Sequence, residues 1–131
     1  MFIDASVLSA MMTDEEEARA FAIRMQRATA RMTSPLAAAN AAILISEALR
    51  LSPTEAGEAV RTFLQLMNIQ PLAVPPRAAA LATEAYERYG QGGQPGRLSL
   101  DDCMTYACAR YYRQPLLSKS DQFKQTDIEL A

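Results

Sequence analysis

The sequence predicts an α/β domain in which helices cover both faces of a small, mostly parallel sheet. Short apolar runs that suit buried strands alternate along the chain with longer segments of helical periodicity. Such alternation is typical of parallel sheets whose strands are joined by crossover helices. The chain has 131 residues, of which 50% are hydrophobic, and this is enough for one domain with a substantial core. We therefore expect a single domain that spans residues 1–131.

Four short segments are the candidate strands. They are rich in apolar residues and lie between turn-forming residues or helical segments. The third contains Pro71 and is the weakest candidate, because proline lacks the amide hydrogen that a sheet requires. A glycine-rich segment, residues 90–96, predicts a flexible loop instead. The candidate strands are residues 1–4, 31–34, 68–72 and 114–117.

Six helical segments separate or follow these strands. Ser52 and Ser99 precede two of them, where a side-chain oxygen can cap the first turn, and Pro35 suits the first turn of an alanine-rich helix. Thr13 and Glu16 have the spacing of a capping box, which predicts that another helix begins at Thr13 with a solvated acidic turn. The expected helices cover residues 5–12, 13–27, 35–49, 52–67, 75–89 and 99–112.

Composition and charge limit the classes of function. The formal net charge is −2, so no overall positive field favours nucleic acid, although a basic rim around an acidic site would not change this sum. No apolar run approaches the roughly 18 residues that a membrane span needs, and we expect no signal peptide before the first strand. We therefore expect a cytoplasmic protein without a membrane partner. The chain contains no histidine, so a hydrolase built on it must use carboxylates, a metal ion and water.

The two cysteines are expected to be reduced and buried. Cys103 and Cys108 are five residues apart within one predicted helix, a spacing that places their side chains on different faces. Two thiols in this arrangement do not suit a disulfide, and buried reduced cysteines are usual in cytoplasmic proteins.

Acidic residues stand at strand ends and at a helix start. Asp4 ends the first strand, Asp121 follows the last strand, and Asp101 and Asp102 lie in the first turn of a helix. The carboxyl ends of parallel strands meet at one edge of a sheet, and carboxylate oxygens are the ligands that Mg²⁺ or Mn²⁺ prefers. The sequence therefore predicts a magnesium or manganese site at this edge. The alternative role of each residue is a helix cap, a dipole-compensating charge or a turn former.

Four short motifs follow one another along the chain. They are M-F-I-D-A-S at residues 1–6, T-S-P-L-A at 33–37, R-L-S-L-D-D-C with Y-A at 97–107, and P-L-L-S-K-S-D-Q-F with T-D-I at 115–128. Together they resemble the motifs of the PIN-domain ribonucleases, specifically the VapC-type toxins of bacterial type II toxin–antitoxin modules. The resemblance implies a PIN-like three-layer α/β/α sandwich and an endoribonuclease with an acidic Mg²⁺ or Mn²⁺ site. It also implies an RNA substrate, a cognate VapB-type antitoxin that places an arginine in the acidic cleft, and a homodimer.

The resemblance assigns roles to individual residues. Asp4 and Asp102 match two metal-binding aspartates of the family, and Ser6 matches a hydroxyl that supports the first of them. Asp101 stands where many relatives have glycine, so we expect it to support the site rather than to bind the metal.

Two positions depart from the family pattern. Asn40 stands where the family usually has glutamate, and asparagine offers a carbonyl oxygen but no negative charge and cannot act as a general base. Glu47 is about 10 Å further along the same helix, too far for the same role without rearrangement. Gln122 replaces the aspartate before phenylalanine, which leaves Asp121 as the carboxylate of that turn. The alternative to an active toxin is therefore a PIN-like binding module that retains antitoxin or RNA binding but has weak or no activity.

Three basic residues flank the acidic segments. Arg97, Lys119 and Lys124 are candidates for contacts with RNA phosphates around the metal. The alternative is that all three are solvated.

Overall fold

Four strands form one parallel sheet in the computed structural model of the protein, which describes residues 1–90 and 97–131. The strand order is β3-β2-β1-β4, and each of the three pairings is parallel. An isolated parallel bridge between Leu116 and Leu130 extends the sheet beyond β4. Each strand has only two residues: β1 is Phe2–Ile3, β2 is Met32–Thr33, β3 is Gln70–Pro71 and β4 is Leu116–Leu117.

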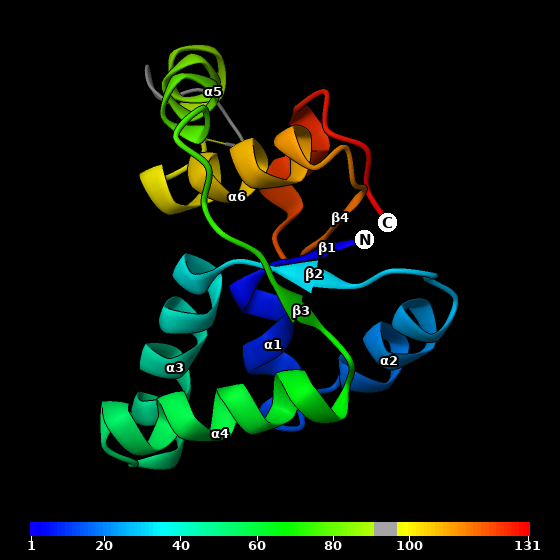
Figure 1. Ribbon diagram of the computed structural model, residues 1–131, viewed down its shortest axis with the longest axis vertical. Coiled ribbons are helices and arrows are strands. Elements are labelled where there is room, and N and C mark those ends of the chain that lie inside the picture. The colour runs from blue at the N-terminus through cyan, green and yellow to red at the C-terminus, as the bar shows by residue number, and fades with distance from the viewer. Residues whose placement is uncertain (91–96) are drawn as a thin grey trace.

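Helices connect the strands and supply most of the mass of the domain (Figure 1). A π-helical turn, η1 (Tyr86–Gly90), continues α5, and a 3₁₀ helix, η2 (Asp121–Gln125), follows β4. Within the described residues, no helix is both long and apolar enough to cross a membrane. The α-helices are α1 (Ala5–Met12), α2 (Ala18–Gln26), α3 (Pro35–Leu49), α4 (Pro53–Leu66), α5 (Ala78–Ala85) and α6 (Leu100–Tyr111).

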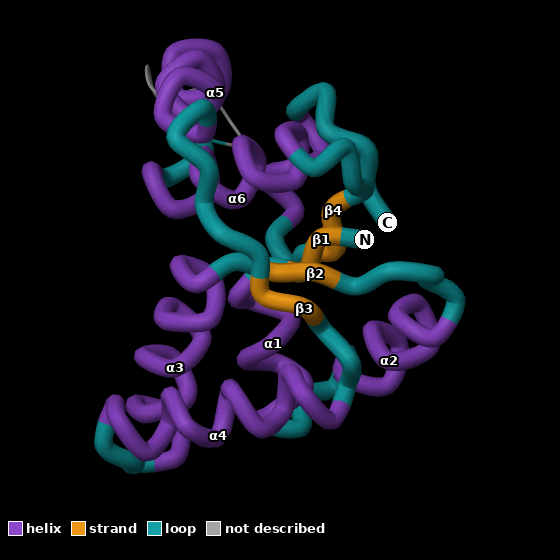
Figure 2. Tube along the Cα trace, viewed as in Figure 1, coloured by secondary structure: helices purple, strands orange, loops and turns teal. Residues whose placement is uncertain are grey.

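The sheet lies between two helical layers, with α1 to α4 on one face and α5 and α6 on the other (Figures 1 and 2). Successive strand residues face opposite layers. Phe2 and its partner Leu116 pack among α5 and α6, whereas Ile3 and its partner Leu117 pack among the other helices. All four side chains are buried, and each contributes roughly 1.5–3 kcal/mol on burial. The predicted three-layer α/β/α fold with a parallel sheet is confirmed.

The order of the strands creates a switch point beside β1. The chain adds β2 and β3 on one side of β1 and then returns to place β4 on the other side. The connections that leave β1 and β4 therefore diverge, which opens a crevice beyond the carboxyl ends of these two strands. Asp4 directly follows β1 and Ser118 directly follows β4, so both residues lie at this crevice.

The predicted start of the second helix is wrong. Thr13 ends α1, because its amide and its hydroxyl both donate to the carbonyl of Ser9. Asp14 then adopts a positive φ of 54°, which takes the chain out of the helix, and α2 begins only at Ala18. The threonine hydroxyl bonds backward along α1 rather than forward to a capping box, as threonine often does in a helix. The acidic run therefore forms a connecting turn.

The three helix starts with a serine cap agree with the sequence. Ser34 accepts from the Ala37 amide, and Ser52 and Ser99 each form a complete capping box. Cys103 and Cys108 are free and buried, as predicted. The strands are shorter than expected, and the helix predicted at 75–89 begins at Ala78 and becomes π-helical at Tyr86. Most of the predicted glycine-rich loop, residues 91–96, lies outside the described residues.

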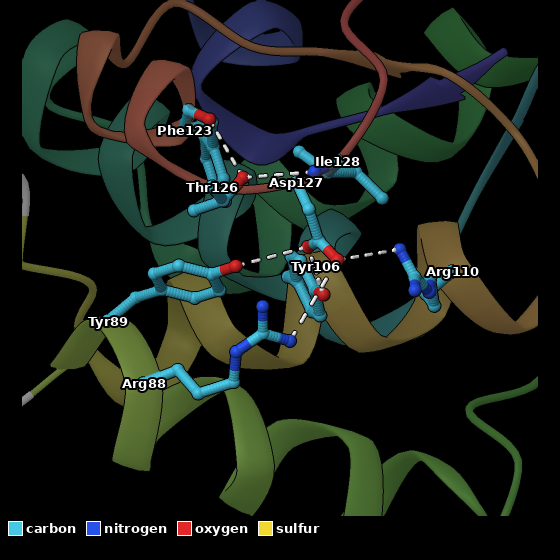
Figure 3. Close-up of polar contacts among 8 residues, drawn as sticks. All are labelled: Arg88, Tyr89, Tyr106, Arg110, Phe123, Thr126, Asp127 and Ile128. Carbon is cyan, nitrogen blue, oxygen red and sulfur yellow. Dashed lines mark hydrogen bonds and ion pairs between the residues drawn. The ribbon is translucent and has the colours of Figure 1, made fainter.

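Asp127 joins the C-terminal segment to α6 and η1 (Figure 3). Its carboxylate accepts hydrogen bonds from the hydroxyls of Tyr106 at 2.5 Å and Tyr89 at 3.3 Å. It also pairs with Arg110 at 3.2 Å and with Arg88 at 3.8 Å. The hydrogen bond from Tyr106, followed by the charges of the two arginines, lowers the pKa of Asp127. Burial and this bond raise the pKa of Tyr106 to about 12.

Replacing Asp127 should therefore destabilise the domain. Asp127→Ala removes the partner of the buried Tyr106 hydroxyl, and such a loss costs about 1–3 kcal/mol. The free energy of unfolding, measured in urea at pH 7, should fall by this amount, whereas Glu129→Ala at a nearby exposed position should change it little. Because the pKa of Asp127 is lowered, its contribution is present above the ordinary carboxyl pKa and is lost as the pH falls through the folded value. This account would be contradicted if the difference in unfolding free energy between Asp127→Ala and the parent did not become smaller at acidic pH.

Candidate active site

A pocket of about 340 Å³ lies at the switch point beyond β1. Its walls come from α1 and α3 in one helical layer and from the first turn of α6 in the other. Among the described residues, the charged side chains that line it are all acidic. The lining residues are Asp4, Ala5, Ser6, Asn40, Ile43, Leu44, Ser99, Asp101, Asp102 and Thr105.

Asp4 is the most buried acid of the pocket, with 7% of its surface exposed. Its Oδ2 accepts hydrogen bonds from the hydroxyls of Ser6 at 2.8 Å and Ser118 at 2.9 Å, and its Oδ1 accepts from Thr105 at 3.2 Å. Three neutral donors orient the carboxylate without neutralising it, and each oxygen keeps lone pairs for a further partner. The structure thus places Ser6 beside Asp4, as the sequence predicted. It adds Thr105 and Ser118, for which no role was predicted from the sequence.

Asp102 belongs to the same pocket and also caps α6. Its Oδ2 accepts from the Ser99 amide at 3.0 Å, while the Ser99 hydroxyl accepts from the Asp102 amide at 3.1 Å. These two bonds hold the carboxylate at the start of the helix. Burial raises the pKa of Asp102, and the negative charges of Asp4 and Asp101 add to this effect, although the bonds to Ser99 oppose it. The pocket therefore concentrates negative charge where it is partly desolvated.

Asn40 lies on α3 and lines the pocket opposite the two aspartates. Its half-buried side chain adds an amide but no charge to the site. Glu47, the carboxylate further along the same helix, is exposed and is absent from the pocket lining. The structure therefore supports the sequence interpretation that Glu47 does not take the place of a carboxylate at position 40.

In the turn after β4, Gln122 rather than Asp121 lies against Asp102, although neither residue lines the acidic pocket. With its amide nitrogen turned inward, Gln122 donates to Asp102 Oδ2 at 3.2 Å and to the Arg97 carbonyl at 3.1 Å. The Asp121 side chain is 85% exposed, pairs with Lys124 at 2.8 Å and lines a neighbouring pocket. The structure therefore does not bring Asp121 together with Asp4 and Asp102. The sequence already indicated that position 122 is the one near the site, because Gln122 directly precedes Phe123, where the family pattern has aspartate.

Two of the three predicted phosphate contacts are engaged by acids within the chain. Lys119 forms an ion pair with Glu15 and lies 3.9 Å from Glu17. This pairing raises the pKa of Lys119 and lowers that of Glu15. Lys124 pairs with Asp121, and Arg97 is exposed. The acidic run after α1 is thus a partner of Lys119, not only a solvated segment.

The donor set of the pocket suits a hard divalent cation. Asp4, Asp102 and the carbonyl of Asn40 offer only oxygen atoms, which Mg²⁺ and Mn²⁺ prefer. A cation there would also relieve the repulsion between the two carboxylates. In the part of the chain that the structure describes, however, no three histidine, cysteine or acidic side chains converge as a metal-holding group. The residues therefore fit a cation that two carboxylates hold and water completes.

Comparison with known proteins identifies the family. Residues 1–129 match the model of the PIN domain. The chain is 34% identical over 133 residues to ribonuclease VapC42 of Mycobacterium tuberculosis, covering 100% of this chain and 98% of the relative. It is also 34% identical over 128 residues to ribonuclease VapC30 of the same species, with coverage of 98% and 95%. A relative named ribonuclease VapC from Mycolicibacterium smegmatis is 32% identical over 128 residues, with coverage of 98% and 97%. The chain belongs to the PIN-domain family, among its VapC-type members.

Neutralising Asp102 should stabilise the metal-free protein. Because the pKa of Asp102 is raised, the folded state loses stability as the pH rises from the ordinary carboxyl range through the folded value. Asp102→Asn should therefore raise the melting temperature at pH 7 in EDTA by on the order of 2 °C, and the gain should vanish below about pH 4. Mg²⁺ should raise the melting temperature of the parent and so reduce the difference in melting temperature between the parent and Asp102→Asn.

Asp101→Asn is the matched control for this measurement. Asp101 lies in the same helical turn but is exposed, so its neutralisation should have less effect on the melting temperature. A lower melting temperature for Asp102→Asn than for the parent at pH 7 would contradict the burial argument.

Proposed function

We propose that this PIN-domain protein is an endoribonuclease toxin of a toxin–antitoxin module, which hydrolyses RNA phosphodiester bonds with Mg²⁺ or Mn²⁺ held by Asp4 and Asp102. The observation that carries this proposal is the pairing of two desolvated carboxylates in one pocket at the switch point of the sheet. The names of the relatives, which are ribonucleases, supply the reaction class.

The acidic pocket needs a cation to accept RNA. A phosphodiester is itself anionic, and Asp4 and Asp102 would repel it in a partly buried site. A divalent ion, when bound, supplies charge neutralisation for the phosphate and an acidified water as nucleophile. Asp4 is oriented for this task by the hydroxyls of Ser6, Ser118 and Thr105. Asp102 is oriented by the capping box at the start of α6.

The remaining polar groups of the pocket orient rather than transfer protons. Asn40 can donate or accept a hydrogen bond to a water or a phosphate oxygen, but its amide does not titrate. Gln122 donates to Asp102 and holds that carboxylate from the side of η2. Asn40 lines the pocket where a carboxylate would bind a cation more strongly, so we expect the metal to be held more weakly than at a site with more carboxylates.

The rim of the pocket fits a VapB-type antitoxin. Ile43 and Leu44 on α3 line the acidic pocket and are exposed, and Leu100 is exposed at the start of α6. A partner segment that combines apolar side chains with an arginine would match both the rim and the acidic centre. Formation of a homodimer stays a prediction.

A binding module with little activity is the second candidate. It is favoured by Asn40, which adds no charge to the pocket, and by the lack of a three-acid metal group among the described residues. Such a protein would keep the antitoxin surface and bind RNA without efficient cleavage.

Restoring a carboxylate at position 40 should separate the two candidates. We expect Asn40→Glu to lower the Mg²⁺ or Mn²⁺ concentration that gives half-maximal cleavage by roughly 10-fold, because each added carboxylate strengthens a hard-cation site. Asp4→Asn should reduce cleavage by more than 10-fold, since it removes a ligand rather than an outer partner, whose loss already costs about 10- to 100-fold. Cleavage of a fluorescent RNA by purified, antitoxin-free protein measures both effects.

Glu47→Gln provides the control, because it changes the charge of an exposed residue on the same helix outside the pocket. Cleavage by the parent that Asp4→Asn abolishes supports the toxin. Cleavage that appears only with Asn40→Glu supports the binding module. Cleavage that survives Asp4→Asn would rule out the metal site.

A further inference from the structure

A second pocket, of about 610 Å³, lies next to the acidic one and has a different charge pattern. Three cationic side chains line it: Arg24 from α2, Lys119 from the turn after β4 and Lys124 from η2. We call it the basic pocket. Its two lining acidic side chains are Glu17 and Asp121, and each is within 4 Å of one of the lysines. Arg24 donates to the main-chain oxygen of Ala131, which also lines the pocket, at 3.4 Å.

The basic pocket shares a wall with the acidic site. Ser118 lines the basic pocket and donates to Asp4 Oδ2 at 2.9 Å. Lys119 follows in sequence, and its amide donates to the hydroxyl of Ser6, which lines the acidic pocket. Ser118, which contacts the Asp4 carboxylate, therefore directly precedes Lys119 in the chain. The main chain of Lys119 thus lies at the wall of the acidic pocket, and Lys119 itself lines the basic pocket.

The acids that face these lysines hold them only weakly. Lys119 pairs with Glu15 and Glu17, and Lys124 pairs with Asp121, all at side chains that are more than a third exposed. Exposed pairs of this kind contribute about 0–1 kcal/mol. They keep the cations in position in the free protein, and a phosphate can displace them at small cost.

The positive surface continues past Arg24. Arg24 also lines a third pocket, of about 600 Å³, together with Arg27 from the turn after α2. Lys119, Lys124 and Arg24 line the basic pocket, and Arg24 and Arg27 line the third pocket, so a series of cations continues from one pocket to the next through Arg24. Such a series suits a flexible polyanion that is bound by its phosphates rather than by its bases.

We propose that the basic pocket binds the phosphate backbone of single-stranded RNA next to the scissile phosphate, through Arg24, Lys119 and Lys124, and that Glu15 and Glu17 hold Lys119 until RNA displaces them. This inference rests on the proposed function for the identity of the polyanion. It adds a binding site outside the acidic pocket and a local competitor for RNA.

Salt-dependent binding tests the site without any cleavage step. A labelled single-stranded RNA of about 12 nucleotides is titrated with the metal-free protein in EDTA, by fluorescence anisotropy, at several salt concentrations. Arg24→Gln and Lys124→Gln should each reduce the slope of log K against log salt by about 0.7, which corresponds to about fivefold weaker binding at 0.1 M salt. Arg61→Gln, an exposed arginine on α4, is the control with the same change of charge.

Removing the two glutamates that pair with Lys119 should strengthen RNA binding. The double variant Glu15→Gln with Glu17→Gln frees Lys119, so it should bind RNA more tightly and with a steeper salt slope than the double variant Glu58→Gln with Glu84→Gln, which removes two exposed acids on α4 and α5. Melting temperatures close to that of the parent show that these variants fold. The proposal would be overturned if variants of the basic pocket had the same RNA affinity and the same salt slope as their controls.

The two proposals fail in different ways. If the parent cleaves RNA but the basic-pocket variants bind like their controls, the inference is wrong and the nuclease stands. If no variant cleaves RNA but the salt slopes change as expected, the basic pocket is an RNA site and the nuclease is wrong.

Discussion

The buried carboxylate of Asp4 is the constraint on which the rest of the site depends. A charge with 7% exposure is costly unless it is hydrogen-bonded, and here the donors come from three separate segments. Ser6 belongs to α1, Thr105 to α6 and Ser118 to the turn after β4. The cost of desolvating one carboxylate therefore fixes the relative positions of both helical layers and of the last strand at the switch point. The same geometry leaves lone pairs on Asp4 that can face a cation.

The sheet alone is too small to supply this precision. Its strands have two residues each, so α6 must be held by side chains on both of its flanks. Thr105 donates to Asp4 toward the site, and the next residue, Tyr106, donates to Asp127 on the other flank. Successive helical residues point about 100° apart, which allows neighbouring side chains to hold one helix between two carboxylates. The stability of the domain and the geometry of the site therefore both depend on the position of α6.

Sequence patterns predicted the layers of the fold because alternation of apolar strands and helices, and serine capping, are local signals. Ser52 and Ser99 form the expected boxes. The box expected at Thr13 fails because the same hydroxyl can bond backward into α1, and local sequence does not decide between these two bonds. The strand ends also differ, since a strand's length depends on where its neighbour ends.

The site was predictable where a motif carried it and unpredictable where the contacts are long-range. Asp4 and Asp102 occupy one pocket, as the motifs implied. Thr105 and Ser118 reach Asp4 across 101 and 114 residues, and no spacing rule indicates such contacts. Whether the last turn presents position 121 or 122 depends on the 3₁₀ geometry of η2, in which neighbouring side chains diverge by about 120°.

A bound RNA would meet side chains of both charges on this chain, whose net charge is −2. Three acidic side chains line one pocket, where a cation would offset them, and three cationic side chains line the adjoining one together with Glu17 and Asp121. Amides at Asn40 and Gln122 reduce the repulsion between acids but also reduce the field that draws in a metal ion. A substrate held partly by Arg24 and Lys119 depends less on that field, because its own phosphate then adds negative charge beside Asp4. The phosphate and the two carboxylates together would hold a cation that the carboxylates alone bind weakly.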